Sequence, residues 1–549
     1  MEEQLPRATR PTLDPNDEAV IAKATVLRDQ RSTDPALQVL NERIAQGLTA
    51  DNPAGLLLLA QIAGLLIDIG SEGHNEQAIQ DGLALLEKHH DQLGTLVTDA
   101  SRHYNLGNAK SSLADLHNPN AFTTPGLADH DLLLAAKNHY WKALKTHHRN
   151  DHFAHQLRTN LANALRKSGR ITEALTAYDD IIASNPNFTM AHLHRGLALL
   201  VLEQCSGTRT TSMLVQAATE YSHTADAPDA SAAVREVAIT MRDRTTKRLK
   251  AHGYKTDHAT KDIAGTRHEA TQHSAYRQFT LRHHLGLCEH SLYCHCNGAR
   301  RDDLMIATAR TPVTGDLVPR LELILNRLKA EFGTARHLYH QATNDNTQDL
   351  HEHEITYTEL FEGETVSIRT ELLRISFRLC LGILDKIALG ICELYNIADP
   401  KEKLYFESFW QPNAKKGKAG TRWATLKAKS DNASLVALYS QATDLGSDGE
   451  WALYKAWRND LEHKFLILTD TPAPPDRYQA RVGTFDTRCV TTKEFTDHNL
   501  RLLQFTRSAI FNFTFCARKE TRATNDDRVT MTLQHKYPEP AHPRRRKTS

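Results

Sequence analysis

The first half of the chain repeats a pattern of small and large residues, and this repeat constrains the fold more than any other feature. Its small positions Ala162 and Gly196 lie 34 residues apart. Small residues let two helices cross closely, and large residues fill the groove beside them. The clearest copy contains Leu161, Ala162, Gly169, Ala174, Tyr178, Ile181 and Pro186. This pattern predicts helix pairs that stack in a row.

Other copies extend the array in both directions. The next copy begins at Gly196, and a weaker copy covers residues 57–86. The remaining copy, interrupted by an insertion at 113–131, contains Leu106, Gly107, Ala136, Tyr140 and Ala143. The period resembles that of the tetratricopeptide (TPR) repeat, which implies a TPR-like helical solenoid over residues 18–225. Such an array offers a concave surface to a protein, peptide or nucleic-acid ligand, and the resemblance does not say which.

The rest of the chain also has apolar residues at helical spacing, so the expected fold class is all-α. A helical bundle is predicted to follow the solenoid. Its patterned segments are 371–396, 404–410, 434–445, 450–468 and 494–516. The other predicted parts are a disordered lead-in at 1–17, a helical connector at 226–275, a middle helical region at 276–350, the helical domain at 351–519 and a basic tail at 520–549.

Composition narrows the classes of protein that fit. Lys and Arg total 67 and Asp and Glu total 66, so any nucleic-acid surface must be a local patch. Charged residues such as Arg374 and Asp385 interrupt 372–397, taken as the most apolar stretch, and a crossing needs about 20 apolar residues. No signal peptide is evident, and the eight cysteines are unevenly spread. We therefore expect a cytoplasmic protein with reduced thiols and no membrane association.

The segment W-R-N-D-L-E-H-K-F at 457–465 contains the side chains best suited to catalysis. A helix here, at about 100° per residue, has one apolar stripe, made of Tyr454, Trp457, Leu461, Phe465 and Leu468. Arg458 lies at its edge, while Asn459 and His463 point away from it. These two side chains therefore face a cleft, another chain or water. A plain surface helix with an Arg458–Glu462 ion pair fits the same pattern.

Several segments around this helix are similar to those of the HEPN (higher eukaryotes and prokaryotes nucleotide-binding) family. The HEPN motif is an Arg, a polar residue, and a His four to six positions after the Arg; Arg458, Asn459 and His463 match it. The other similar segments are S-F-R-L-C-L-G-I-L-D-K-I-A at 376–388, F-E-S-F-W at 406–410, N-A-S-L-V-A-L-Y at 432–439, R-R-D-D-L at 300–304 and E-F-x-x-A-R at 331–336. Together they resemble the TPR-linked bacterial branch of the family.

This resemblance implies a metal-independent endoribonuclease without a cofactor, acting on RNA as a toxin or as an antiviral or stress effector. Arg458, Asn459 and His463 would be catalytic: the histidine moves the proton and the arginine binds the phosphate. Products would carry a 2′,3′-cyclic phosphate and a 5′-hydroxyl. The resemblance also implies a homodimer through the HEPN domain. The alternative is a noncatalytic TPR scaffold whose bundle binds RNA or nucleotide.

Two further sets of residues are candidates for supporting roles. Asp385 interrupts an apolar run, so it either faces Arg458 or His463 or pairs with a structural cation. Basic residues at 411–430 are interleaved with tryptophans and can follow a phosphate backbone. The candidate RNA-binding residues are Lys415, Lys416, Lys418, Arg422 and Lys427. A solvated loop and helix face explain the same residues.

Metal sites are weaker possibilities. The segment Cys288–Cys296 contains zinc-ligand types without the usual pair spacing, so buried thiols with incidental histidines are the favoured reading. His337, His340, His351 and His353 form another loose cluster. A metal-dependent nuclease would draw its ligands from the cysteine segment or from Asp302 and Asp303. No catalytic metal is therefore predicted.

Overall fold

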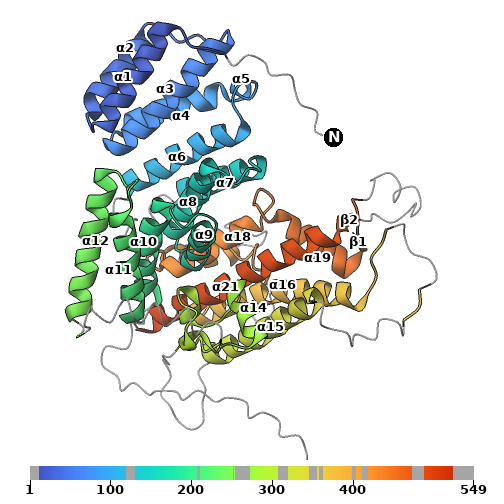
Figure 1. Ribbon diagram of the computed structural model, residues 1–549. Coiled ribbons are helices and arrows are strands. Elements are labelled where there is room, and N and C mark those ends of the chain that lie inside the picture. Colours follow the sequence, from blue (N-terminus) through green and yellow to red (C-terminus); the bar gives the residue numbers. More distant parts are fainter. Residues whose placement is uncertain are drawn as a thin grey trace, which may run out of the picture.

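The computed structural model describes residues 11–118, 130–206, 211–251, 253, 272–306, 320–344, 355–357, 363–397, 404–410, 418–472 and 488–522, except for the side chains of 418–421, 423 and 522. Most of these residues are helical, and the one sheet within them has two short strands. The predicted helical fold class is therefore confirmed. Figure 1 shows the N-terminal helices stacked above a bundle formed by the C-terminal helices.

The N-terminal helices pack mainly on their neighbours in sequence. Their bounds are α1 Pro15–Asp29, α2 Thr33–Ala45, α3 Pro53–Glu72, α4 Glu76–Lys88, α5 His90–Leu93, α6 Asp99–His117, α7 His130–Thr146, α8 His152–Lys167, α9 Ile171–Ser184, α10 Thr189–Ser206 and α11 Thr211–Asp226. The side chains of Asp14, Asn52 and Asp151 accept hydrogen bonds from the first turns of α1, α3 and α8. These caps fix where the helices begin.

Two glycines show why the repeat needs small residues. A Cβ atom on Gly107 would lie 2.6 Å from the ring of Tyr140, and one on Gly196 would lie 2.7 Å from the ring of Tyr221. In each pair the glycine belongs to the first helix of a pair and the tyrosine to the second. The predicted small and large positions therefore pack on each other here, and the TPR assignment itself stays a prediction.

Helix α3 corrects the sequence analysis on apolar segments. Among the described helices, α3 is the one whose length and composition would allow it to cross a membrane. The helix within residues 372–397 does not meet these criteria. Its two sides face different core clusters: Ile62 and Leu66 belong to one, and Leu59 and Ile67 to the other. A helix that is apolar all round and packed on both sides is a core helix of this domain.

The C-terminal half forms a bundle around its longest helix, α21 Thr492–Arg522, which packs against α15, α16 and α18 (Figure 1). The other elements are α12 Ala232–Ala251, α14 Ala275–Arg282, α15 Arg320–Thr343, α16 Ile368–Tyr395, α17 Lys418–Lys427, α18 Ala433–Asp444, α19 Ala452–His463, β1 Leu466–Thr469 and β2 Arg488–Thr491. Single 3-10 turns lie at Glu289–Leu292 and Asn297–Ala299. Helix α21 extends past Glu520, so the predicted tail does not begin there. Residues 523–549, with Arg544–Lys547, lie outside the described part.

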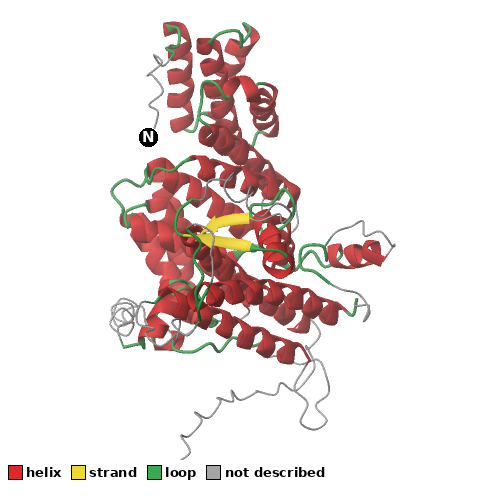
Figure 2. Cartoon of the chain, turned by 90° about the vertical axis from the view of Figure 1, so that its right-hand side faces the viewer, coloured by secondary structure: helices red, strands yellow, loops and turns green. Residues whose placement is uncertain are grey.

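The predicted helix 450–468 is wrong at its C-terminal end. Helix α19 ends at His463, Lys464 is extended, and Leu466–Thr469 pairs in parallel with Arg488–Thr491 (Figure 2). Phe465, expected in the buried stripe, is 60% exposed because the chain has left the helix. Leu468 is buried, but within β1 rather than on the helix.

Two smaller segments also differ from prediction. Residues 15–17 belong to α1, because Pro15 starts that helix and Asp14 caps it, so the disordered lead-in does not extend to residue 17. Residues 404–410 form turns instead of a short helix. Part of the predicted insertion, at 119–129, and most of the connector after residue 251 lie outside the described residues.

The stacked helices join the bundle through a tight and charged contact. Gly169 has φ +80°, and a Cβ atom there would lie 2.2 Å from the carbonyl oxygen of Ala433. Arg170 donates to Asp444 of α18 at 2.5 Å and to Glu173 at 2.6 Å. Lys137 of α7 donates to the same Asp444 carboxylate. The two halves therefore meet through ion pairs that are shielded from water.

Candidate active site on helix α19

The site begins with an ion pair between two helices of the bundle. Arg458, on α19, donates from Nη1 to Oδ2 of Asp385, on α16, at 2.8 Å. Both side chains are partly buried, with 31% of Arg458 and 18% of Asp385 exposed. Asp385 therefore faces Arg458, which was one of its two predicted surroundings. The alternative prediction, a plain surface helix with an Arg458–Glu462 ion pair, differs from the structure in one respect. Arg458 pairs with Asp385 of a neighbouring helix rather than with Glu462.

The turn at 404–410 supports this ion pair. The backbone N–H of Phe406 donates to Oδ1 of Asp385 at 2.8 Å, so the carboxylate is held at both oxygens. The Arg458 guanidinium lies 5.8 Å from the ring centroid of Tyr405, and Lys455 pairs with Glu407. The carboxylate and the Tyr405 ring therefore both contact Arg458, and the Lys455–Glu407 pair joins the same turn to α19. Among the described residues only its Nη1 donates a hydrogen bond, so Nε and Nη2 are available to an anion.

Asn459 and His463 lie on the part of α19 that is open to solvent. Both side chains are exposed. Within the described chain, no hydrogen bond or ion pair is formed by either side chain. His463 is the last residue of the helix, where the chain turns into β1. The histidine is therefore accessible to a substrate or to a second protein chain.

The opposite side of α19 is an aromatic cluster that the sequence predicted only in part. Tyr454 and Trp457 are buried against Phe377 of α16 and Phe495 of α21. His498 adds ring contacts to both, and its Nδ1 lies 3.2 Å from the Tyr454 hydroxyl. Burial lowers the pKa of His498 to about 4. A neutral imidazole in this place holds α21 against the back of α19.

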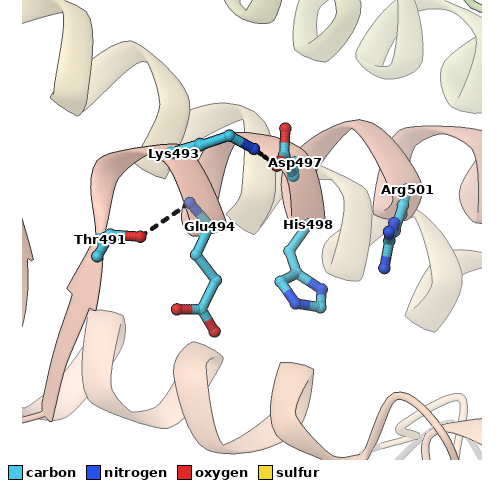
Figure 3. A pocket seen from close by; sticks show the side chains of 6 residues that line it. All are labelled: Thr491, Lys493, Glu494, Asp497, His498 and Arg501. Atoms are coloured by element: carbon cyan, nitrogen blue, oxygen red, sulfur yellow. Dashed lines mark hydrogen bonds and ion pairs between the residues drawn. The ribbon is translucent and has the colours of Figure 1, made fainter. Parts of the chain in front are cut away.

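His498 also borders an open cavity of about 220 Å³ at the start of α21. Figure 3 shows Glu494, His498 and Arg501 on one side of the helix, while Lys493 and Asp497 pair on another. The sequence analysis did not single out these residues. Their helical spacing is a signal that could have found them.

Of the predicted RNA-binding residues, Arg422 and Lys427 are the two whose side chains belong to the described part of the chain. Lys415 and Lys416 lie outside the described residues, as does the side chain of Lys418. Arg422 is 6% exposed and packs with its guanidinium 5.0 Å from the Phe409 ring, so its role is structural. Lys427 is exposed on α17. Arg422 differs from the prediction because helix α17 directs its side chain onto the 404–410 segment.

The alternative metal ligands are occupied in other ways. Asp302 pairs with Arg277 at 2.8 Å and with Arg336 at 2.7 Å, so it joins the R-R-D-D-L and E-F-x-x-A-R segments structurally. His340 packs on the rings of Tyr276 and Phe279, while His351 and His353 lie outside the described residues. Across the described ranges, no three His, Cys, Asp or Glu side chains are grouped to hold a metal ion, including those of Cys288–Cys296.

This geometry is suited to binding and charge stabilisation of a phosphate beside an accessible histidine. A guanidinium fixed by a carboxylate through Nη1 keeps its Nε–Nη2 edge for an anion. A comparison with protein families then gives a match to the LA2681-like HEPN family over residues 312–520. The chain carries a HEPN domain. Comparisons with curated proteins and with solved structures gave no match.

The matched range places the site within the HEPN domain. It includes α16, α19 and α21, which carry Asp385, Arg458 and the supporting aromatic cluster. It also includes α15, which the sequence analysis assigned to the middle region and which packs along α16. HEPN families are typically nuclease-related and commonly have ribonuclease activity.

Proposed function

We propose that the HEPN domain is a metal-independent endoribonuclease, acting as a toxin or as an antiviral or stress effector. The observation that carries this proposal is the Arg458–Asp385 ion pair on the same helix that carries the exposed His463. Asn459 would orient the phosphate or the histidine. The N-terminal helices would sense a trigger or hold the domain inactive.

The chemistry uses the nucleophile that RNA already carries. The 2′-oxygen attacks the adjacent phosphorus while the bond from phosphorus to the 5′-oxygen breaks. A proton leaves the 2′-hydroxyl and a proton reaches the departing 5′-oxygen, which leaves a 2′,3′-cyclic phosphate and a 5′-hydroxyl. His463 would perform one of these proton transfers, and Arg458 would stabilise charge on the phosphate oxygens.

We expect the active form to be a homodimer joined through α19, since one copy supplies one histidine for two proton transfers. Phe465 and Tyr405 beside the site are 60% and 48% exposed, and they offer apolar area to a second copy. The mass in solution should then be twice the 61.7 kDa of one chain. A strictly monomeric protein that still cleaves RNA would contradict this arrangement.

Activity should survive EDTA, because a guanidinium rather than a divalent ion meets the phosphate charge. The test is to induce the protein in cells, sequence the RNA 5′-hydroxyl ends, and repeat the cleavage with purified protein in EDTA. New 5′-hydroxyl ends that persist in EDTA are the expected result. Loss of cleavage in EDTA with recovery on adding a divalent ion would replace the proposal with a metal nuclease. No cleavage under any trigger would favour the noncatalytic scaffold.

A further inference from the structure

A second cavity of the HEPN domain lies along α16 and contains an arginine without a partner. It is open, has a volume of about 220 Å³ and is bordered by one residue of α15. The lining residues are Glu331, Ile375, Arg378, Leu379, Gly382 and Lys386. Arg378, Gly382 and Lys386 follow one another at intervals of about one helical turn, so they form a row along the helix.

Arg378 is the cation of this row that has no protein partner. Its Nε is buried and accepts no partner, and within the described part of the chain its guanidinium forms no hydrogen bond or ion pair. Lys386 donates to Glu331 at 2.7 Å, and Arg327 pairs with the same carboxylate at 3.2 Å. The carboxylate of the cavity is therefore already shared by two cations. A partly buried guanidinium that no protein group satisfies is stabilised when an anion reaches it.

A glycine keeps the cavity open between Arg378 and Lys386. Gly382 lies inside α16, where glycine destabilises a helix relative to alanine. Packing does not require it, because a Cβ atom there would meet among the described atoms only Nζ of Lys386 within 4 Å, at 3.8 Å. Gly390 of the same helix shows the contrast, since a Cβ atom there would lie 2.6 Å from the Phe513 ring. Gly382 therefore leaves room for a ligand beside the helix backbone.

The cavity lies on the side of α16 that carries the ion pair of the proposed site. Arg378 precedes Asp385 by about two turns, or about 10 Å along the axis, and shares its face of the helix. Asp385 contacts Arg458 of α19, whereas Lys386 contacts α15. Around the helix, Arg378 and Gly382 lie between these two contacts. They therefore face the space between α15 and α19, which both pack on α16 (Figure 1).

A second contact fixes the direction of α19 along this face. Arg374, one turn before Arg378, donates to the backbone carbonyl of Leu466 at 2.8 Å, while Asp385 accepts from Arg458. The two helices therefore run in opposite directions. Because Arg378 lies between Arg374 and Asp385, it lies opposite the segment from Arg458 to Leu466. This segment contains the exposed histidine of the proposed site.

The charges around the cavity favour a polyanion. Arg327, Arg378 and Lys386 are three cations around one carboxylate, that of Glu331. A second copy of the chain that packed this face on itself would bring like charges together. An RNA strand presents a phosphate at each nucleotide, and a phosphate offers two oxygens to a guanidinium.

We propose that Arg378 binds a phosphate next to the scissile one, so that the cavity along α16 is a subsite for the RNA strand. This inference rests on the proposed ribonuclease function. The Arg378 guanidinium donates to the phosphate, Gly382 lets the strand approach the helix, and Lys386 adds a second positive charge. Arg378 contacts the substrate away from the reacting atoms, so it contributes to binding and not to the chemical step.

The test measures binding of a fluorescein-labelled, mixed-sequence single-stranded RNA by anisotropy at several salt concentrations. The full-length protein carries His463→Ala, so that the RNA stays intact. Adding Arg378→Gln should weaken binding about 3- to 10-fold, as expected for one lost hydrogen-bonded contact. It should also reduce the slope of log affinity against log salt by about 0.7, the value for one phosphate on a single strand. Arg378→Lys keeps the charge and should keep the slope.

Two further variants separate a phosphate contact from other effects. Gly382→Glu places a carboxylate one turn from both Arg378 and Lys386, where the phosphate is expected. It should raise the unfolding midpoint and yet weaken RNA binding at least as much as Arg378→Gln. Arg242→Ala removes a cation that pairs with Asp243 on α12, outside the HEPN domain, and should leave RNA binding and its salt dependence unchanged.

In protein that retains His463, Arg378→Gln should raise KM for RNA and leave kcat unchanged. The proposal is overturned if Arg378→Gln binds RNA with the original affinity and salt slope, if Arg242→Ala has the same effect, or if no RNA binds. It is also overturned if Arg378→Gln changes the mass in solution without changing RNA binding, which would assign this face to a second copy. Failure of the proposed function differs, because RNA would then bind through Arg378 without being cleaved.

Discussion

Replacing His463 with alanine should reduce RNA cleavage by about 10²- to 10⁴-fold, the usual contribution of a positioned general acid or base. The side chain is exposed and makes no hydrogen bond or ion pair with another described residue, so its removal should leave the fold intact. The effect should therefore fall on the chemical step. The measurement is single-turnover cleavage of a defined RNA, with the unfolding midpoint recorded for the same samples.

The matched control is an exposed histidine on another part of the chain. His148 is exposed between α7 and α8, and the His148→Ala variant should cleave RNA at the wild-type rate. Arg458→Lys should be nearly as inactive as Arg458→Ala, because an ammonium that pairs with Asp385 has no second N–H edge for the phosphate. Cleavage by His463→Ala at the wild-type rate would remove this histidine from the mechanism and favour the scaffold alternative.

The sequence predicted the central helix of the site because its residues obey a local periodicity. Tyr454, Trp457 and Leu461 recur at helical spacing, and this places Arg458 at the edge of the buried face. The end of the helix was not predictable in the same way. Phe465 and Leu468 continue the helical pattern, yet Leu466–Thr469 pairs with a strand about 20 residues later. Strand pairing depends on the partner segment, which no window around residue 465 contains.

Long-range pairing also decided what individual charged residues do. The sequence left open whether Asp385 faces the site or pairs with a structural cation. In the structure Asp385 accepts hydrogen bonds from Phe406 and Arg458, which establish its neighbours but not its role. Arg422 looked like part of a basic patch, but the fold packs it on Phe409. A charge count along the chain cannot distinguish a solvated cation from one turned inward, because that difference depends on residues distant in sequence.

The contact between the stacked helices and the bundle was not predicted at all. Lys137 and Asp444 are 307 residues apart in sequence, and neither belongs to a motif. Their side chains are 2% and 0% exposed, and Arg170, also 2% exposed, shares the same carboxylate. Burial lowers the pKa of Lys137 well below its ordinary value, so the ammonium depends on its partner. Asp444 therefore pairs with two buried cations, one of which also pairs with Glu173.

Asp444→Ala should lower the free energy of unfolding by about 3–5 kcal/mol, because removing one partner leaves a buried charge uncompensated. Lys137 should account for most of the loss, since Arg170 keeps two hydrogen bonds to Glu173, at 2.8 and 2.6 Å. The measurement is denaturant unfolding followed both by far-UV circular dichroism and by tryptophan fluorescence. Trp141 of α7 packs 5.8 Å from Trp451 of the bundle, so fluorescence reports separation of the two halves.

Two further variants distinguish a lost charge pair from a general defect in packing. Asp431→Ala removes an exposed ion pair to Lys519, in which the carboxylate is 75% exposed, and should cost less than about 1 kcal/mol. Lys137→Met combined with Asp444→Leu replaces the buried pair with apolar side chains and should recover most of the stability lost in Asp444→Ala. If the double variant is as unstable as Asp444→Ala, the loss comes from packing around α18 and not from an unpaired lysine. Recovery would show that charge compensation holds the stacked helices on the HEPN domain.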